Sequence, residues 1–252
     1  MTLRRRALLL LLFGSIFLTG LLALAPATLV GYALMRSSGG LLSLAQTEGS
    51  LWHGSGILLL KHKSHYQDLG TYRWMLRPWS GAMQVWADNE LPMTVSFHPR
   101  AQRMDIKTLH VRLPATALEL LSAQLEPYQL QGILDIRSDS VSLDATGMDG
   151  NVTVDWCRAA SGLSLIRPLG DYRIALQGNG SRIDALLTTL SGKLILNAKI
   201  HHDAALGLQV NGTAQATPEG EAELGEMLHH IGPEVRPGVY NLALMPQART
   251  NP

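Results

Sequence analysis

The stretch Gly132-Ile133-Leu134-Asp135-Ile136 shows the pattern from which the fold of this chain can be predicted. A glycine permits a turn or bulge that other residues disfavour, and the residues after it alternate between the two faces of an extended strand. The same arrangement recurs at residues 54–60, 81–86, 192–196 and 207–210. Short strands opened by glycine predict an antiparallel β-meander with one buried face.

Further strands are expected on both sides of these stretches, at residues 93–97, 140–144, 152–156, 172–176 and 240–244. Two segments repeat apolar residues at helical spacing instead: Leu118, Leu121 and Leu125, and then Leu224, Leu228 and Ile231. Pro127 and Gly232-Pro233 are expected to end these helices. The expected fold class is mainly β: an extended antiparallel meander or partly open, curved sheet with one or two short helices.

The N-terminal segment differs from the rest, because no charged residue lies between Arg6 and Arg36. This run exceeds the roughly 20 apolar residues needed to cross ~30 Å of hydrocarbon, so one transmembrane helix is expected before the strands. Three arginines precede the run and one follows it closely, which predicts a cytoplasmic N-terminus. The expected division is a short cytoplasmic N-terminus and membrane anchor at 1–36, followed by an exported β domain at 37–252.

The alternative to an anchor is a cleaved secretory signal. The basic start and the triplet Ala23-Leu24-Ala25 match the signal and its small-residue cleavage pattern. Pro26 would follow the cut directly, and its rigid ring fits poorly into the extended conformation that a peptidase grips. We therefore favour an anchor that is retained.

Charge and cysteine content exclude two classes of protein. Lys and Arg total 21 and Asp and Glu total 20, giving a net charge of +1, and the single basic block is Arg4-Arg5-Arg6. A phosphate backbone would need more positive charge, so no nucleic-acid partner is expected. Cys157 is the one cysteine, which excludes an intramolecular disulfide and favours a buried, inert thiol.

No catalytic or metal-binding constellation is evident, although nine histidines are present. Adjacent pairs such as His201-His202 would point to opposite faces of a strand, and no H-E-x-x-H spacing accompanies them. A G-x-S-x-G nucleophile motif is also missing from the sequence. We therefore expect no enzyme activity, no metal and no cofactor.

The tryptophans form the most specific motif in the chain. Trp52 lies in the stretch E-G-S-L-W-H-G-S-G at 48–56, and Trp74 and Trp79 lie in R-W-M-L-R-P-W-S-G at 73–81. Large rings next to glycines can close a core, or an indole can serve a half-wet binding surface. Both hypotheses stay open, and the candidate interaction or structural residues are Trp52, Gly54, Trp74, Pro78 and Trp79.

These two stretches, after an N-terminal anchor, resemble the type II secretion system protein N family (general secretion pathway protein N). Its members carry a G-T-x-W-x-G-like motif and then a W-x-L-x-P-like motif, and Ser50 stands where the family more often has threonine. Further similar stretches are 130–134, 154–157, 168–172, 207–212 and 231–240.

The resemblance implies an accessory, non-enzymatic component of the secretion system that assists export of folded periplasmic proteins across the outer membrane. It implies a single-pass protein of the cell inner membrane with a periplasmic C-terminal domain. The expected partners are other inner-membrane components of the system and membrane lipid. The alternative function is a membrane-anchored, lipid-binding or lipid-handling β-groove protein, because an apolar concave sheet can hold acyl chains.

Overall fold

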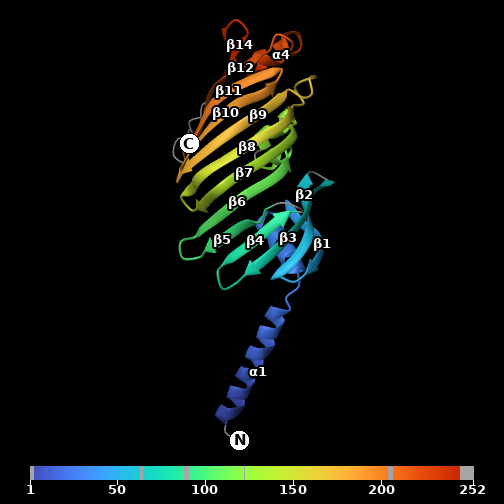
Figure 1. Ribbon diagram of the computed structural model, residues 1–252, viewed down its shortest axis with the longest axis vertical. Coiled ribbons are helices and arrows are strands. Elements are labelled where there is room, and N and C mark those ends of the chain that lie inside the picture. The colour runs from blue at the N-terminus through green and yellow to red at the C-terminus, as the bar shows by residue number, and fades with distance from the viewer. Residues whose placement is uncertain (1–2, 63–64, 88–90, 122, 204–206, 245–252) are drawn as a thin grey trace, which may run out of the picture. The chain divides into compact units, whose positions relative to one another are not determined.

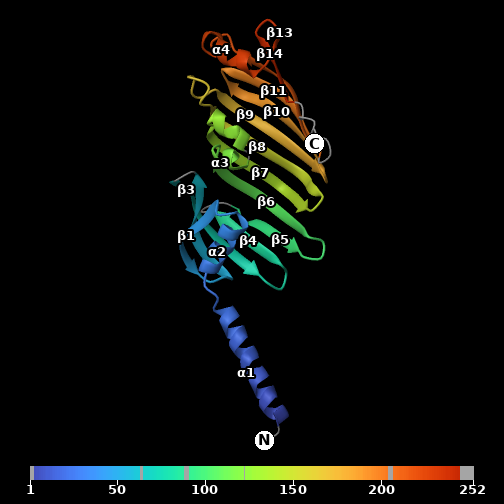
Figure 2. The same ribbon diagram turned by 180° about the vertical axis from the view of Figure 1, so that it is seen from behind.

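The computed structural model describes residues 3–62, 65–87, 91–121, 123–203 and 207–244, and the chain folds as two compact units, 1–89 and 90–252. Within each unit neighbouring strands pair antiparallel, almost always in chain order. Figures 1 and 2 show the strands of each unit side by side, each next to the strand that precedes it in the chain for most of the order. The structure confirms the mainly β, meandering fold that the glycine-opened runs predict.

Unit 1 combines two helices with four strands. Its elements are α1 (Leu3–Ala23), α2 (Thr28–Ser37), β1 (Leu42–Gly49), β2 (His53–His62), β3 (His65–Arg77) and β4 (Ala82–Ala87). Helix α2 packs against β1. The hairpins β1–β2, β2–β3 and β3–β4 follow one another, so this unit is a small meander with a helix on it.

The uncharged N-terminal run folds as two helices, contrary to the single helix expected. The chain is extended around Pro26, which forms a β-bridge with Ser50. On either side, the Ala25 carbonyl accepts a hydrogen bond from Leu51 N at 2.8 Å, and Ala27 N donates to the Gly49 carbonyl at 3.3 Å. Proline has no N–H and disfavours helix in the residue before it, so α1 ends here.

In the part of the chain that the structure describes, no helix combines the length and apolarity needed to cross a membrane, in contrast to the transmembrane helix expected from the sequence.

Unit 2 is the larger sheet. Its elements are β5 (Met93–His98), β6 (Arg103–Pro114), α3 (Ala117–Leu121), the 3-10 helix η1 (Ala123–Tyr128), β7 (Gln131–Asp144), β8 (Gly147–Ala160), β9 (Gly170–Asn179), β10 (Arg182–Gly192), β11 (Leu194–Asp203), β12 (Gly207–Ala216), α4 (Glu221–Ile231), β13 (Glu234–Arg236) and β14 (Val239–Leu244). Strand order follows the chain from β5 to β12, and β14 then lies between β12 and β13.

Several expectations need correction at the level of single elements. The strands expected at 132–136 and 140–144 are one strand, β7. Five strands were not expected from the sequence, and none of them opens with glycine: β1, β3, β6, β10 and β13. The helix expected around 118–125 divides into α3 and η1, and Pro127 lies inside η1 rather than after it. A proline cannot donate the bond that a continuous α-helix needs at that point.

The best-packed core of unit 2 lies under α4, where the sequence predicted a helix. Leu224 and Leu228 of α4 are 0% and 2% exposed and pack against Tyr240 and the strand residues Leu194 and Ala214. The expected helical spacing thus places one apolar side of α4 on the end of the sheet.

Candidate functional site

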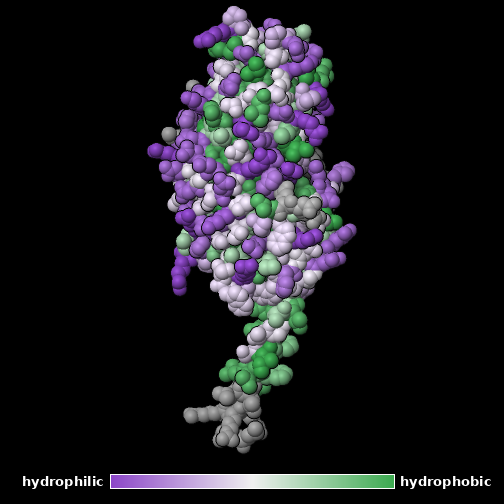
Figure 3. Space-filling view, in the orientation of Figure 1, coloured by the Kyte–Doolittle hydropathy of each residue, from purple (hydrophilic) through white to green (hydrophobic). Residues whose placement is uncertain are grey.

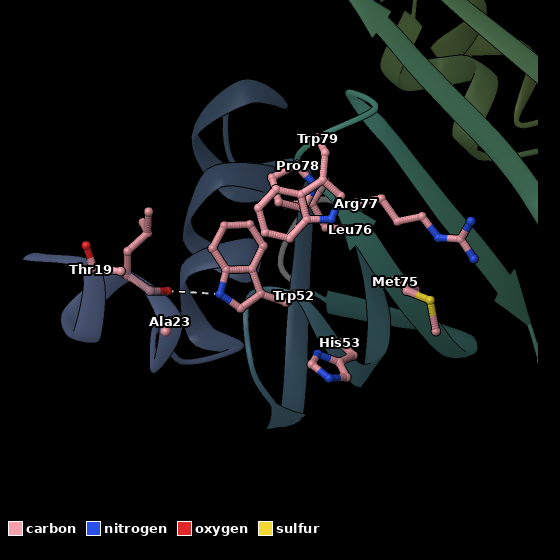
Figure 4. A pocket seen from close by; sticks show the side chains of 10 residues that line it. Thr19, Ala23, Trp52, His53, Met75, Leu76, Arg77, Pro78 and Trp79 are labelled. Atoms are coloured by element: carbon pink, nitrogen blue, oxygen red, sulfur yellow. Dashed lines mark hydrogen bonds between the residues drawn. The ribbon is translucent and has the colours of Figure 1, made fainter. Parts of the chain in front are cut away.

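The tryptophan motifs come together in unit 1 around a pocket at the C-terminal end of α1 (Figure 4). The cavity has a volume of about 590 Å³. Its lining comes from the end of α1, from the β1–β2 turn, and from the end of β3 with the turn after it: Thr19, Leu22, Ala23, Trp52, His53, Met75, Leu76, Arg77, Pro78 and Trp79.

Trp52 connects the helix to the sheet. Its indole N–H donates a hydrogen bond to the Leu22 carbonyl at 2.9 Å, drawn as the dashed line in Figure 4. The last carbonyls of a helix lack partners within the helix, and Leu22 is the next-to-last residue of α1. Trp52 therefore caps α1 and fixes its end against the β1–β2 turn.

Trp74 and Gly54 form a packed pair on neighbouring strands. Trp74 is 4% exposed, its indole N–H donates to the Leu51 carbonyl at 3.2 Å, and it lies opposite Gly54 in the β2–β3 register. A Cβ added at Gly54 would lie 2.6 Å from Cζ2 of Trp74 and 2.6 Å from the Glu48 carbonyl oxygen. Glycine at this position thus makes room for the buried ring, which is a structural role.

Trp79 is placed quite differently, since its side chain is 93% exposed. It follows Pro78 in the turn between β3 and β4, which is closed by a hydrogen bond from Ser80 N to the Arg77 carbonyl at 3.2 Å. The two interpretations of the motif therefore apply to different residues. Gly54 and Trp74 pack, whereas Pro78 and Trp79 form an exposed wall of the pocket.

The pocket continues into the apolar surface of α1. The large apolar side chains between Leu10 and Leu24 are 55–82% exposed, and they occupy every side of the helix. A second hollow of about 790 Å³ is lined by Phe17, Leu21 and other apolar residues, including Leu51 of the β1–β2 turn. Apolar surface of this extent on a folded chain marks a site that meets another apolar phase or partner.

Unit 2 carries a second candidate surface, a row of apolar residues directly opposite one another across eight strands. This apolar ladder consists of Val111, Ile136, Val154, Ile174, Leu187, Ala198, Gly212 and Leu242. Most of these side chains are half-buried, and α4 packs on the β12 and β14 end of the row. The expectation of one apolar face is met, on strands that the alternating pattern largely predicted.

The opposite face carries a charged ladder that the sequence analysis missed. Arg112, Asp135, Asp155 and Arg173 face one another across β6 to β9. Each is the sequence neighbour of an apolar-ladder residue, so strand alternation places it on the other face. Hydrophilic side chains are correspondingly frequent over these strands in the view of Figure 3. The alternation of polar and apolar residues in each strand could have indicated a charged face. Only the register of the strands, however, shows that these four residues form one row.

Arginines hold the two carboxylates of the charged ladder in their ionised form. Arg173 donates two hydrogen bonds to Asp155, at 2.7 and 2.9 Å, and these lower the Asp155 pKa despite burial. At Asp135 burial acts to raise the pKa, but hydrogen bonds from Arg137 and Arg112 outweigh it, and the pKa is lowered. The Asp135 and Asp155 side chains are 8% and 12% exposed, so the arginines compensate the cost of burying the two carboxylates.

Comparison with models of known protein families shows to which family the chain belongs. A family model described as type II secretion system (T2SS), protein N, matches residues 40–243. The chain belongs to the T2SS protein N family. No curated protein and no solved structure matches the chain in the corresponding searches.

The protein N match begins just before β1 and ends in β14, so it covers both tryptophan motifs and both ladders. The resemblance carried by the motifs is thereby confirmed, and it identifies a secretion-system component rather than a known enzyme family. Within the described residues of the chain, no three His, Cys, Asp or Glu side chains come together as a metal site. Burial, reinforced by Asp171 and Asp155, raises the Cys157 pKa, which keeps this thiol protonated at neutral pH.

Proposed function

We propose that this member of the family is an accessory component of the type II secretion system in the inner membrane, where it assists export of folded periplasmic proteins across the outer membrane. The observation that carries the proposal is the family match over residues 40–243. The N-terminal segment supplies the location: α1 would hold the chain in the membrane, with its N-terminus in the cytoplasm and both sheets in the periplasm.

One structural property of α1 supports the membrane location. Its apolar side chains are exposed on all sides, and a helix that is apolar all round is stable when lipid or other helices surround it. The three arginines at 4–6 favour a cytoplasmic start.

Other inner-membrane components of the system are the proposed partners, and two kinds of surface would serve them. Helix α1 can pack against other membrane helices. Strands β1 and β13 are the terminal strands of the strand order in the described chain, so their outer backbone groups are suited to β-augmentation.

Photo-crosslinking in secreting cells tests this function. A photo-reactive amino acid at Ser43 of β1, at Val235 of β13 or at Leu18 of α1 should capture secretion-system components. Lys199, an exposed residue of β11 within the sheet, serves as the control position. Deletion of the protein should also lower the amount of cargo in the medium. If no test position captures more than Lys199, and deletion leaves secretion unchanged, the assembly function is refuted.

The apolar ladder of unit 2 favours a second candidate function, the binding of lipid acyl chains on this face. Its half-buried apolar row crosses eight strands, which at about 4.8 Å per strand spans roughly 35 Å, longer than an extended acyl chain. Such a row offers continuous apolar contact to a chain lying across the strands.

Adjacent residues of β9 provide a matched test, because Ile174 belongs to the apolar ladder and Ala175 lies exposed on the other face. Ile174→Glu should abolish uptake of labelled phospholipid by the purified protein, while Ala175→Glu should leave it unchanged. Native mass spectrometry reports the bound lipid, and thermal unfolding checks that both variants are folded. A lipid-free wild type that takes up no label would remove this candidate.

A further inference from the structure

The β3–β4 turn has the composition of a segment that meets a membrane surface. Residues 77–81 are Arg-Pro-Trp-Ser-Gly, with no acidic residue, and all five are exposed. We call this segment the Trp79 turn. Exposing an indole to water at 93% leaves a large apolar surface unburied, although an indole is well suited to a boundary that is apolar on one side and wet on the other.

The position of the Trp79 turn is tied to the end of α1. Both Pro78 and Trp79 line the same pocket as Leu22 and Ala23, the last residues of that helix. The 2.9 Å hydrogen bond from Trp52 to Leu22 fixes the pocket wall to the helix end. Leu22 is the next-to-last residue of α1, so a membrane that holds α1, as proposed above, ends close to this pocket.

We propose that the Trp79 turn lies in the interfacial region of the phospholipid bilayer beside α1, with acyl chains filling the pocket between the turn and the helix. This inference rests on the proposed function, since it takes α1 to be in the membrane. Unit 1 then contacts the bilayer at two places, through the helix and through the turn.

Phospholipid is the occupant because the pocket is continuous with the apolar surface of α1. Leu22 belongs both to the lining of the pocket and to the exposed apolar residues of the helix, so the lipid that surrounds the helix also reaches the pocket. Tryptophan and arginine are among the side chains that anchor a protein at the headgroup level of a bilayer. Trp79 and Arg77 supply both from one turn.

Quenching of tryptophan fluorescence by brominated phospholipid tests the inference. The full chain is reconstituted into phosphatidylethanolamine–phosphatidylglycerol vesicles that carry bromine either near the headgroup or near the end of the acyl chain. The chain contains five tryptophans, so the Trp79 signal is obtained as the difference between wild type and Trp79→Phe. Trp86→Phe is the matched control, since Trp86 lies in β4 of the same unit, opposite Arg73 of β3, and does not line the pocket.

We expect shallow bromine to quench the Trp79 difference signal by at least twofold more than deep bromine, while the Trp86 difference signal is unaffected. Extraction of the same vesicles with alkaline carbonate reports separately whether α1 holds the chain in the membrane. A chain that stays in the membrane while Trp79 is not quenched overturns this inference and leaves the proposed anchor intact. If alkaline carbonate extracts the chain from the vesicles, both this inference and the proposed anchor are overturned. Capture of a protein instead of lipid by a photo-reactive residue at position 79 in cells also overturns it.

Discussion

Replacing Gly54 by alanine separates the packing part of the tryptophan motif from its surface part. The added methyl carbon would lie 2.6 Å from the Glu48 carbonyl oxygen and 2.6 Å from Cζ2 of Trp74. Carbon contacts are favourable at about 3.5–4.0 Å, so both neighbours would have to move by roughly 1 Å. Neither moves easily, because one is the backbone of β1 and the other is a ring that is 4% exposed.

Overpacking a core by one methyl group typically costs about 1–3 kcal/mol, and we expect Gly54→Ala at the upper end because two rigid groups are displaced. For a unit of this size 1 kcal/mol lowers the melting temperature by about 4–8 °C, so unit 1 should melt more than 10 °C lower. Hydrogen exchange read by mass spectrometry assigns the loss to β2 and β3, while peptides of β8 and β9 should exchange as in wild type.

Gly225→Ala in α4 is the control, since a Cβ there has no atom within 4 Å, and alanine favours a helix interior by about 0.5–1 kcal/mol. Gly225→Ala should leave the melting temperature of unit 1 unchanged and should slow hydrogen exchange in α4. If β2 and β3 exchanged hydrogen as slowly in Gly54→Ala as in wild type, the inferred close packing of Gly54 against Trp74 would be refuted.

Three further perturbations follow from contacts in the structure. Leu224→Ala should lower the unfolding free energy of unit 2 by about 2–5 kcal/mol in urea titrations, because this side chain of α4 is completely buried in the core that α4 forms with the sheet. A loss under about 1 kcal/mol would contradict that packing. Trp52→Phe should speed hydrogen exchange at the end of α1, by removing the bond to Leu22, whereas Trp79→Phe should not. Asp155→Asn should destabilise unit 2 at pH 7 by about 1–3 kcal/mol, since Arg173 loses its charged partner. The Asp155 pKa is lowered on folding, so its stabilisation is complete above the unfolded pKa of about 3.9 and is lost as the pH falls through the folded value. The difference between wild type and Asp155→Asn should therefore shrink in urea titrations below about pH 4, and a difference that is constant from pH 7 to pH 2 would refute the ion pair.

The β-meander was predictable because it depends on local rules, whereas the roles of the three motif tryptophans were not. Trp74 lies inside a strand and faces the core, and Trp79 lies two residues beyond the last residue of β3. The four residues between them do not show where the strand alternation stops, although Pro78 and Gly81 are typical turn residues. The hydrogen bond from Trp52 to Leu22 joins residues 30 apart and had no local signal.

The sequence predicted two strands where the structure has one, β7. This strand shows why the face on which a side chain lies could be predicted better than the length of a strand. Leu134 and Ile136 occupy even positions, while Val141 and Leu143 occupy odd ones, so strict alternation would place the two pairs on opposite faces. The structure adds a bulge between Arg137 and Val141, where four steps along β7 correspond to three along β8.

One extra residue reverses the alternation, so Val141 is 3% exposed, on the side of the sheet to which Ile136 belongs. Strand β6 makes the matching change near Thr108, whose φ of 55° interrupts the extended backbone, and Ile106 therefore pairs with Val141 while Val111 pairs with Ile136. The reversal of alternation after residue 137 thus marks a bulge that keeps apolar side chains on one face, and the apolar face extends along the whole of β7 because of it.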